Sequence, residues 1–167
     1  MAFSIGRLQF LDSYQFTQQS LEKLAKTLKE EDFIYTKKEF PNVEQFKLLI
    51  KKGVYPYDFI TDIRQLESNE PIDIPRQDMF FNKLNDQGIS DDEYQHGKNV
   101  FNKCCPNKTL REYHDVYLKS DILLLTDFFE KYRRMCLEYY KLDPVHYYTA
   151  PGNIYIYFFF SAFEGDG

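Results

Sequence analysis

The clearest pattern of hydrophobic and polar positions lies in residues 109–140, which contain neither glycine nor proline. Apolar and aromatic side chains recur there at helical spacing, which predicts one long amphipathic helix. Thr109, followed three residues later by Glu112, is typical of a capping box at the start of such a helix. The residues expected on its buried stripe are Tyr117, Leu124, Leu125, Phe128, Tyr132, Cys136 and Tyr139.

Asp121 falls on the same stripe, where a carboxylate is costly to bury unless it is paired, hydrogen-bonded or bound to a metal. Two interpretations stay open. Asp121 could sit at the edge of the stripe and reach solvent or a nearby lysine. Alternatively, because residues four apart on a helix are neighbours, the phenol of Tyr117 and the Asp121 carboxylate could hold a water beside a divalent ion. That arrangement suits metal-assisted hydrolysis of a phosphodiester.

The remaining patterns predict shorter elements. Residues 7–12 alternate as in a strand, with Leu8 and Phe10 on one face. The Pro-Ile-Asp-Ile-Pro run at 71–75 indicates an extended connector. Amphipathic spacing predicts three further helices. The first and the last of them follow the cap residues Ser20 and Ser90. These helices are expected at residues 21–28, 43–51 and 91–103.

Strand patterns are confined to the N-terminal part of the chain. One or two strands beside several helices do not make a self-sufficient sheet. The expected fold class is therefore α+β, mostly helical, and the chain is expected to be a piece of a larger domain.

Composition adds limits on function. A chain of 167 residues can bury one ordinary core, and its aromatic content of 18% argues against disorder. The net charge of −5 argues against nucleic-acid binding through bulk charge but is compatible with a local basic face. Neither a signal peptide nor a run of about 18 apolar residues is found, so we expect a soluble intracellular chain with no membrane partner.

The three cysteines, Cys104, Cys105 and Cys136, include no C-x-x-C pair, and the histidines are scattered. This pattern favours three reduced thiols in packing roles over a structural zinc site.

Three ordered segments, residues 52–57, 113–125 and 136–152, resemble the protein-primed family B DNA polymerases of viruses, linear plasmids and self-synthesising transposons. The similarity spans most of residues 7–152. In that family the Y-x-x-x-D step, here Tyr117 to Asp121, is the third motif of the 3′–5′ proofreading exonuclease, an RNase H-like domain. The resemblance implies that residues 1–152 are the C-terminal part of an incomplete exonuclease domain, with 58–108 as a connector or insertion.

The resemblance also implies roles for individual residues. Asp121 would be a ligand of a two-metal site for Mg²⁺ or Mn²⁺, and Tyr117 would orient the attacking water. Lys52 matches a basic residue that assists catalysis, where an ammonium can stabilise charge on the scissile phosphate. Tyr57 matches an aromatic residue that contacts the 3′ end of single-stranded DNA, where a ring can stack on a base. The alternatives are a solvated helix-end cation for Lys52 and a packed loop aromatic for Tyr57.

The N-terminal strand carries a further match. Ser13, after Asp12, corresponds to a Ser-Leu pair that contacts single-stranded DNA and the priming terminal protein in the family, but Tyr14 replaces the leucine here.

The sequence lacks the first two exonuclease motifs and the polymerase carboxylates. A two-metal site needs carboxylates from all three exonuclease motifs, so Asp121 alone is expected to bind metal weakly. Residues 153–167 depart from the family pattern as a β-prone apolar tail in place of the link to the polymerase domain, and we expect this aberrant tail to be loosely placed.

Three hypotheses follow. The first is a fragment of a DNA-directed DNA polymerase, a nucleotidyltransferase, that carries a proofreading exonuclease motif and is inactive alone. The second is a non-catalytic helical module that binds single-stranded DNA or another protein. The third, an independent nuclease, is disfavoured because one acidic residue cannot replace three.

Overall fold

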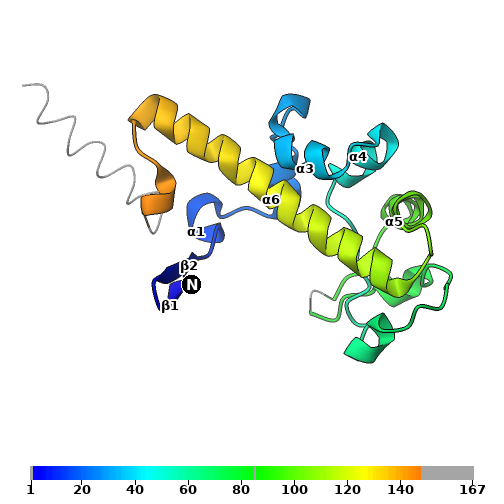
Figure 1. Cartoon of the computed structure of the whole chain (residues 1–167). Helices are drawn as coiled ribbons and strands as arrows, with labels where there is room; N and C mark the ends of the chain where they lie inside the picture. Colours follow the sequence, from blue (N-terminus) through cyan, green and yellow to red (C-terminus); the bar gives the residue numbers. More distant parts are fainter. Residues whose placement is uncertain (1, 85, 148–167) are drawn as a thin grey trace, which may run out of the picture.

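The computed structural model describes residues 2–84 and 86–147, and its largest element is the helix α6, Leu110–Tyr140. Figure 1 shows α6 running through the molecule, with α3 and α4 beside it and α5 near its N-terminal end. The other elements, in chain order, are β1 Ala2–Ile5, β2 Leu8–Leu11, α1 Tyr14–Thr17, α2 Leu21–Ala25, η1 Glu30–Asp32, α3 Ile34–Glu39, α4 Val43–Leu49, η2 Ile63–Leu66, η3 Gln77–Phe80, α5 Asp91–Cys104 and η4 Pro144–His146, where η denotes a 3₁₀ turn.

The long helix is unbroken, as predicted. The Thr109 hydroxyl accepts a hydrogen bond from the Glu112 N–H at 3.1 Å, and Lys141 ends the helix in the left-handed conformation with φ of 56°. The predicted capping box is only half formed, because the Glu112 carboxylate accepts hydrogen bonds from Asn107 instead.

Most shorter elements also follow the predictions, with changes at their ends. The helices α2 and α4 end two or three residues early, whereas α5 begins at Asp91, directly after its predicted cap Ser90, which forms a complete capping box with Glu93. Residues 71–75 contain no regular element. The strand β2 lies within the predicted residues 7–12 and pairs antiparallel with β1.

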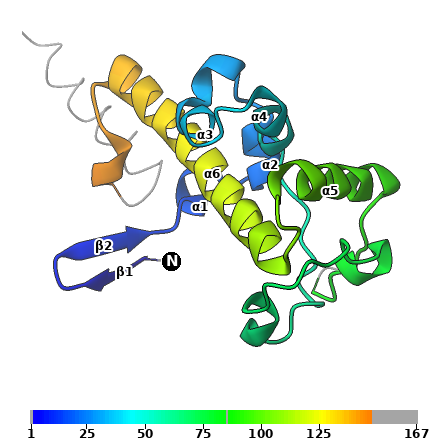
Figure 2. The ribbon, with the colours of Figure 1, turned by 45° about the vertical axis from the view of Figure 1, so that its right-hand side comes forward.

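This β-hairpin stands apart from the helices (Figure 2). Its pairs Phe3–Phe10 and Ile5–Leu8 place four apolar side chains on one face, and all four are exposed. The Phe3 and Phe10 rings stack on each other with centroids 4.7 Å apart. The hairpin is the one sheet among the described residues, so the fold is α+β and mostly helical.

Two apolar clusters hold the helices together, and α6 contributes to both. The larger cluster joins α4, α5 and the start of α6, and it also includes Phe80 and the adjacent thiols Cys104 and Cys105. The smaller cluster joins α2, α4 and Phe33 to Leu124 of α6. Segment 58–108 therefore supplies part of the core, because Phe80, Val100 and Phe101 lie within it.

The buried stripe of α6 differs from the expected one. Tyr139 is 67% exposed, and Leu125, Phe128 and Tyr132 are only partly buried. The stripe is rotated because α2 packs against α6 through the cluster around Leu124 and α3 packs through hydrogen bonds to Asp127. η4 also contacts α6. The buried residues of α6 are Leu110, Tyr113, Tyr117, Ser120, Leu124, Asp127 and Cys136.

Asp127 is the carboxylate that α6 buries most deeply, with 1% of the residue exposed. Its Oδ1 accepts a hydrogen bond from the Tyr35 N–H at 2.8 Å, and its Oδ2 accepts from the Thr36 N–H at 3.0 Å and from the Thr36 hydroxyl at 2.6 Å. These backbone donors lie in the first turn of α3, where N–H groups have no partner within the helix. Asp127 thus caps α3 from a distant part of the chain.

Cys104, Cys105 and Cys136 are all buried, which confirms their predicted packing roles. Burial raises the pKa of Cys104 to about 11 and that of Cys105 to about 12, so both stay protonated thiols at neutral pH. No helix in the described part of the chain is long and apolar enough to cross a membrane. The predictions for the tail, residues 153–167, lie outside the described residues.

Candidate functional site

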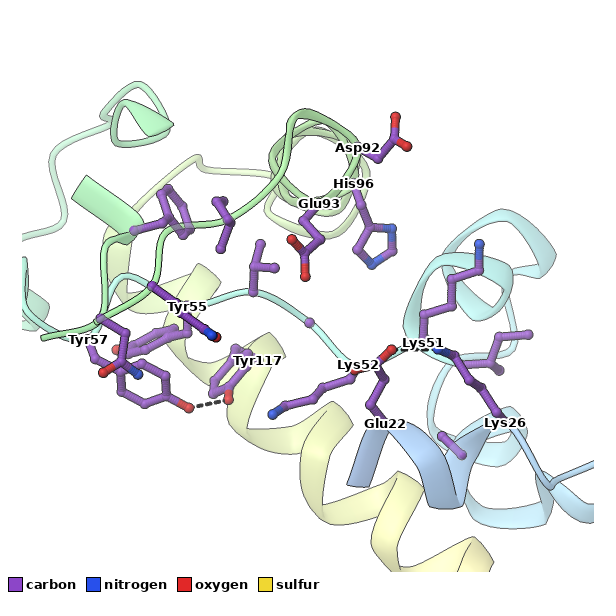
Figure 3. A pocket seen from close by; sticks show the side chains of 18 of the residues that line it. Glu22, Lys26, Lys51, Lys52, Tyr55, Tyr57, Asp92, Glu93, His96 and Tyr117 are labelled. Atoms are coloured by element: carbon purple, nitrogen blue, oxygen red, sulfur yellow. Dashed lines mark hydrogen bonds and ion pairs between the residues drawn. The ribbon is translucent and has the colours of Figure 1, made fainter. Parts of the chain in front are cut away.

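A groove of about 690 Å³ opens beside the first half of α6. Its floor is the segment 50–57 that follows α4, and its walls come from α2, α5 and the loop 80–89 (Figure 3). Gly53 allows this close packing, because a Cβ atom there would lie 3.0 Å from the Tyr117 ring. Tyr117 therefore borders the groove directly behind the segment that carries Lys52 and Tyr57.

Tyrosine rings fix Tyr117 in place. The Tyr55 ring stacks on the Tyr117 ring with centroids 4.6 Å apart and lies nearly parallel to the Tyr113 ring at 6.4 Å. The Tyr57 ring meets Tyr117 edge-on, and the two hydroxyls share a hydrogen bond. The Tyr55 hydroxyl is 2.5 Å from Nδ1 of His114. Such packing leaves the Tyr117 ring few alternative positions.

Tyr117 is a neutral phenol in this setting. Burial raises its pKa first, and the hydrogen bond with Tyr57 and the charge of Asp121 raise it further. Burial likewise raises the pKa of Tyr55 to about 12. Neutral hydroxyls can both donate and accept hydrogen bonds, so this edge of the groove offers polar contacts without charge.

Asp121 lies one turn after Tyr117 on the same side of α6, as predicted, but it does not line the groove. It is half-buried, and its Oδ1 is buried without a hydrogen-bond partner. Burial raises the pKa of the Asp121 carboxyl and outweighs the hydrogen bond with Tyr117 and the charge of Lys52, which both lower it. Asp121 thus combines features of both interpretations: it lies at the edge of the buried stripe, yet one oxygen is left for a further contact.

Lys52 is exposed, and its side chain extends along the groove toward Tyr117 (Figure 3). Its positive charge lowers the pKa of Asp121 and also that of Glu22 on the facing helix α2. The ammonium therefore lies within electrostatic reach of both carboxylates. Glu22 is already paired with Lys26 at 2.5 Å.

The residues around the groove and Asp121 offer one suitable ligand for the divalent metal that the family resemblance implies. The unpartnered Oδ1 of Asp121 fits a metal ligand, because a buried carboxylate oxygen needs a partner. However, residues 2–84 and 86–147 contain no group of three or more His, Cys, Asp or Glu side chains that could hold an ion. These residues do not by themselves fit a two-metal centre.

Ser13 and Tyr14 lie away from the groove that Tyr117 borders. Ser13 borders a second groove of about 390 Å³, formed with Phe16, Val145 and the middle of α6. Tyr14 is 58% exposed, and its N–H donates to Asp12 Oδ1 at 3.0 Å. The structure therefore brings together Lys52, Tyr57, Tyr117 and Asp121 but does not place Ser13 and Tyr14 with them.

Sequence reasoning missed several residues around the groove. Tyr55 and His114 could have been noticed, because they flank Tyr57 and Tyr117 within the same two motifs. Lys51 and His96 also line the groove. His96 carries no sequence signal of its own, since it lies on α5 within the segment that was expected to be a connector.

No protein-family model, curated protein or solved structure matches the chain. Two of the three sequence segments, residues 52–57 and 113–125, meet beside the groove.

Proposed function

We propose that the chain is part of an RNase H-like 3′–5′ exonuclease domain of a protein-primed DNA polymerase, and that its groove receives the 3′ end of single-stranded DNA. One observation carries the proposal. Two segments about sixty residues apart bring Lys52, Tyr57 and Tyr117 to one groove, with Asp121 one turn behind Tyr117. These are the residues that the Y-x-x-x-D motif and its upstream basic segment would have to bring together.

Each side chain suits a particular contact with DNA. Tyr57 is 52% exposed at the groove, so its ring is open to a base, and stacking on one base stabilises a complex by about 1–3 kcal/mol. The Lys52 ammonium would lie near a backbone phosphate and offset its charge. The Tyr117 hydroxyl would orient a water or a phosphate oxygen once Tyr57 turns toward a base.

Catalysis needs more than this groove provides. Asp121 would supply one carboxylate for Mg²⁺ or Mn²⁺, and hydrolysis would require further carboxylates. Polymerisation, the nucleotidyltransferase activity, would belong to the complete enzyme. Contact with DNA or the priming terminal protein is proposed for the separate surface around Ser13 and Tyr14.

DNA binding tests the proposal directly. A fluorescent oligothymidylate with a free 3′ hydroxyl should bind the chain, and Tyr57→Ala should weaken binding by about tenfold, the loss of one stacked base. Fluorescence anisotropy at fixed salt gives both affinities. The matched control is Tyr139→Ala, because Tyr139 is an exposed tyrosine of α6 that does not line the groove. Equal affinities for the two variants would contradict the proposed groove.

The competing function is a binding module without chemistry. It is favoured because the described residues contain no group of three or more His, Cys, Asp or Glu side chains that could complete a metal site with Asp121. A 3′-labelled oligonucleotide incubated with the chain and Mg²⁺ or Mn²⁺ should stay intact under either proposal. Degradation that disappears in Asp121→Asn would show an independent nuclease and would exclude the binding module.

A further inference from the structure

His96 has an unsatisfied ring nitrogen beside the groove. It projects from α5 toward the groove in Figure 3, and its Nε2 is buried with no hydrogen-bond partner. A buried polar atom without a partner is unfavourable and calls for a ligand, a water or a role in function. Gly97 lets α5 come this close, because a Cβ atom there would lie 2.8 Å from Val54 Cγ2. The imidazole is thereby held against the floor of the groove.

Lys51 lies near His96, on the segment that forms the floor of the groove. His96 and Lys51 both line the groove, and both also line a smaller cavity of about 10 Å³ beneath it. Burial lowers the pKa of His96, and the charge of Lys51 lowers it further. Two groups that repel each other when charged are therefore neighbours. A negatively charged ligand between them would remove that repulsion.

The other charges of the groove leave this corner open to an anion. Glu22 is paired with Lys26 across the groove, and Glu93 accepts hydrogen bonds from the Ser90 N–H and hydroxyl, both at 2.8 Å. Asp92 also lines the groove, but in Figure 3 its carboxylate points up from α5 whereas the His96 ring points down. Among the described residues, neither Lys51 nor the neighbouring Lys52 forms an ion pair.

We infer that Lys51 and His96 form an anion subsite that holds a backbone phosphate of a strand bound in the groove. This inference rests on the proposed function and adds to it a second contact, made by α5. It places one phosphate near Lys52 and Tyr117 and another along the strand at Lys51 and His96. The segment 58–108 would then be part of the binding surface through α5.

Binding of a phosphate should favour protonation of the His96 ring. The ring would be neutral in the free protein at pH 7.5 and would gain charge when a phosphate binds, so affinity should increase as the pH falls to 5.5. Each unit by which binding raises the pKa of His96 strengthens binding by up to about tenfold at low pH. The titratable groups that line the groove or the small cavity together with His96 are Lys51, Lys52, Tyr55 and Tyr57 from the floor, Asp92 and Glu93 from α5, Tyr113 and Tyr117 from α6, and Glu22 and Lys26 from α2. Ordinary carboxyl, lysine and tyrosine groups titrate outside this pH range.

The decisive experiment is a pH titration of the histidine ring signals by NMR. It is performed on the full chain, first alone, then with inorganic phosphate and then with oligothymidylate. The His96 titration should move to higher pH with both probes. His146, in η4 and outside the groove, supplies an internal reference that should not follow in the titration with inorganic phosphate. A His96 titration that is unchanged by saturating oligothymidylate would overturn the subsite and assign the unsatisfied nitrogen to a water in the small cavity.

Two variants test the same point through binding. Lys51→Gln should weaken oligothymidylate binding by about three- to tenfold and reduce the slope of affinity against salt by about one. His96→Gln should remove the dependence of affinity on pH between 5.5 and 7.5. The control is Lys47→Gln, which removes an exposed charge of α4 that does not line the groove. Equal effects of Lys51→Gln and Lys47→Gln would show that Lys51 contributes only to the overall positive charge, which would contradict the inference.

The outcomes separate this inference from the proposed function. If Tyr57→Ala weakens binding while Lys51→Gln and His96→Gln do not, the groove binds DNA and the subsite is wrong. If oligothymidylate does not bind but inorganic phosphate still shifts the His96 titration, the anion subsite stands and the proposed function fails.

Discussion

Two carboxylates of α6, Asp121 and Asp127, lie six residues apart and have opposite surroundings. Asp127 is almost fully buried, and its oxygens accept three hydrogen bonds from the start of α3. Asp121 is half-buried, lies beside Tyr117 and Lys52, and has one buried oxygen without a partner. Residue type and helix are the same in both cases. The difference lies in what the neighbouring segment offers to each carboxylate.

The comparison separates structural from functional carboxylates by how their oxygens are used. A buried carboxylate whose oxygens are satisfied by protein donors stabilises the fold and has little capacity left for a ligand. A carboxylate with an unsatisfied oxygen costs stability in the free protein and can recover it when a cation or a donor binds. By this criterion Asp127 belongs to the scaffold and Asp121 to the candidate site.

The largest effect is expected for Asp127→Ala. This change removes three hydrogen bonds to a charged group and leaves the buried Thr36 hydroxyl and two N–H groups without partners. The free energy of unfolding should fall by about 3–5 kcal/mol, as for other broken buried charge networks. Urea denaturation followed by circular dichroism measures it. A loss below about 1 kcal/mol would show that Asp127 is not structural and would remove the contrast with Asp121.

A smaller loss is expected for Thr36→Val, which keeps the shape of the fully buried side chain but removes the hydroxyl that donates to Asp127. Asp127 keeps its two backbone donors, so the free energy of unfolding should fall by only about 1–2 kcal/mol. Thr126→Val on α6 is the control, because the Thr126 hydroxyl only donates to the Ile122 carbonyl of its own helix. If the control costs as much as Thr36→Val, the cap would have no special contribution.

The smallest effect, with the opposite sign, is expected for Asp121→Asn. Burial raises the pKa of the Asp121 carboxyl above its ordinary value of 3.8, so the folded state binds this proton more tightly than the unfolded state. The carboxyl therefore favours the folded state most below pH 3.8, and this advantage is lost as pH rises through the folded pKa. At pH 7 the asparagine variant should equal or exceed the original stability by less than about 1 kcal/mol.

A pH series sharpens this last test. The gain from Asp121→Asn should shrink as the pH falls from 7 toward 4, because the original carboxyl becomes protonated. Thermal unfolding midpoints of both proteins across this range show the trend. A clear loss of stability at pH 7 would mean that the Asp121 charge is satisfied inside the protein and that the two carboxylates are alike.

The sequence was a good guide wherever a signal was local. Cap residues predicted where α5 and α6 begin, because an N-cap depends only on residues within one turn. The absence of breakers predicted one continuous α6. The four-residue spacing placed Tyr117 and Asp121 on one side of it, because helix geometry alone decides this.

Features that depend on packing between distant segments were missed or misplaced. The expected stripe of α6 was wrong at Tyr139, because no local pattern says which face α2 and α3 will cover. Asp127 was passed over because its donors are Tyr35 and Thr36, far away in the chain. His96 was missed for the same reason, since it approaches the groove only through the packing of α5 against the segment 50–57.

The cap on α3 also constrains the order of events during synthesis. The donors in α3 and the Asp127 carboxylate are 91 and 92 positions apart in the sequence. A six-residue helix is too short to persist in water on its own. While the ribosome extends the chain, α3 must therefore wait for most of α6 to emerge before its first turn is secured. Until then its hydrophobic neighbour Phe33, which becomes buried in the finished fold, stays available to chaperones and to other nascent chains.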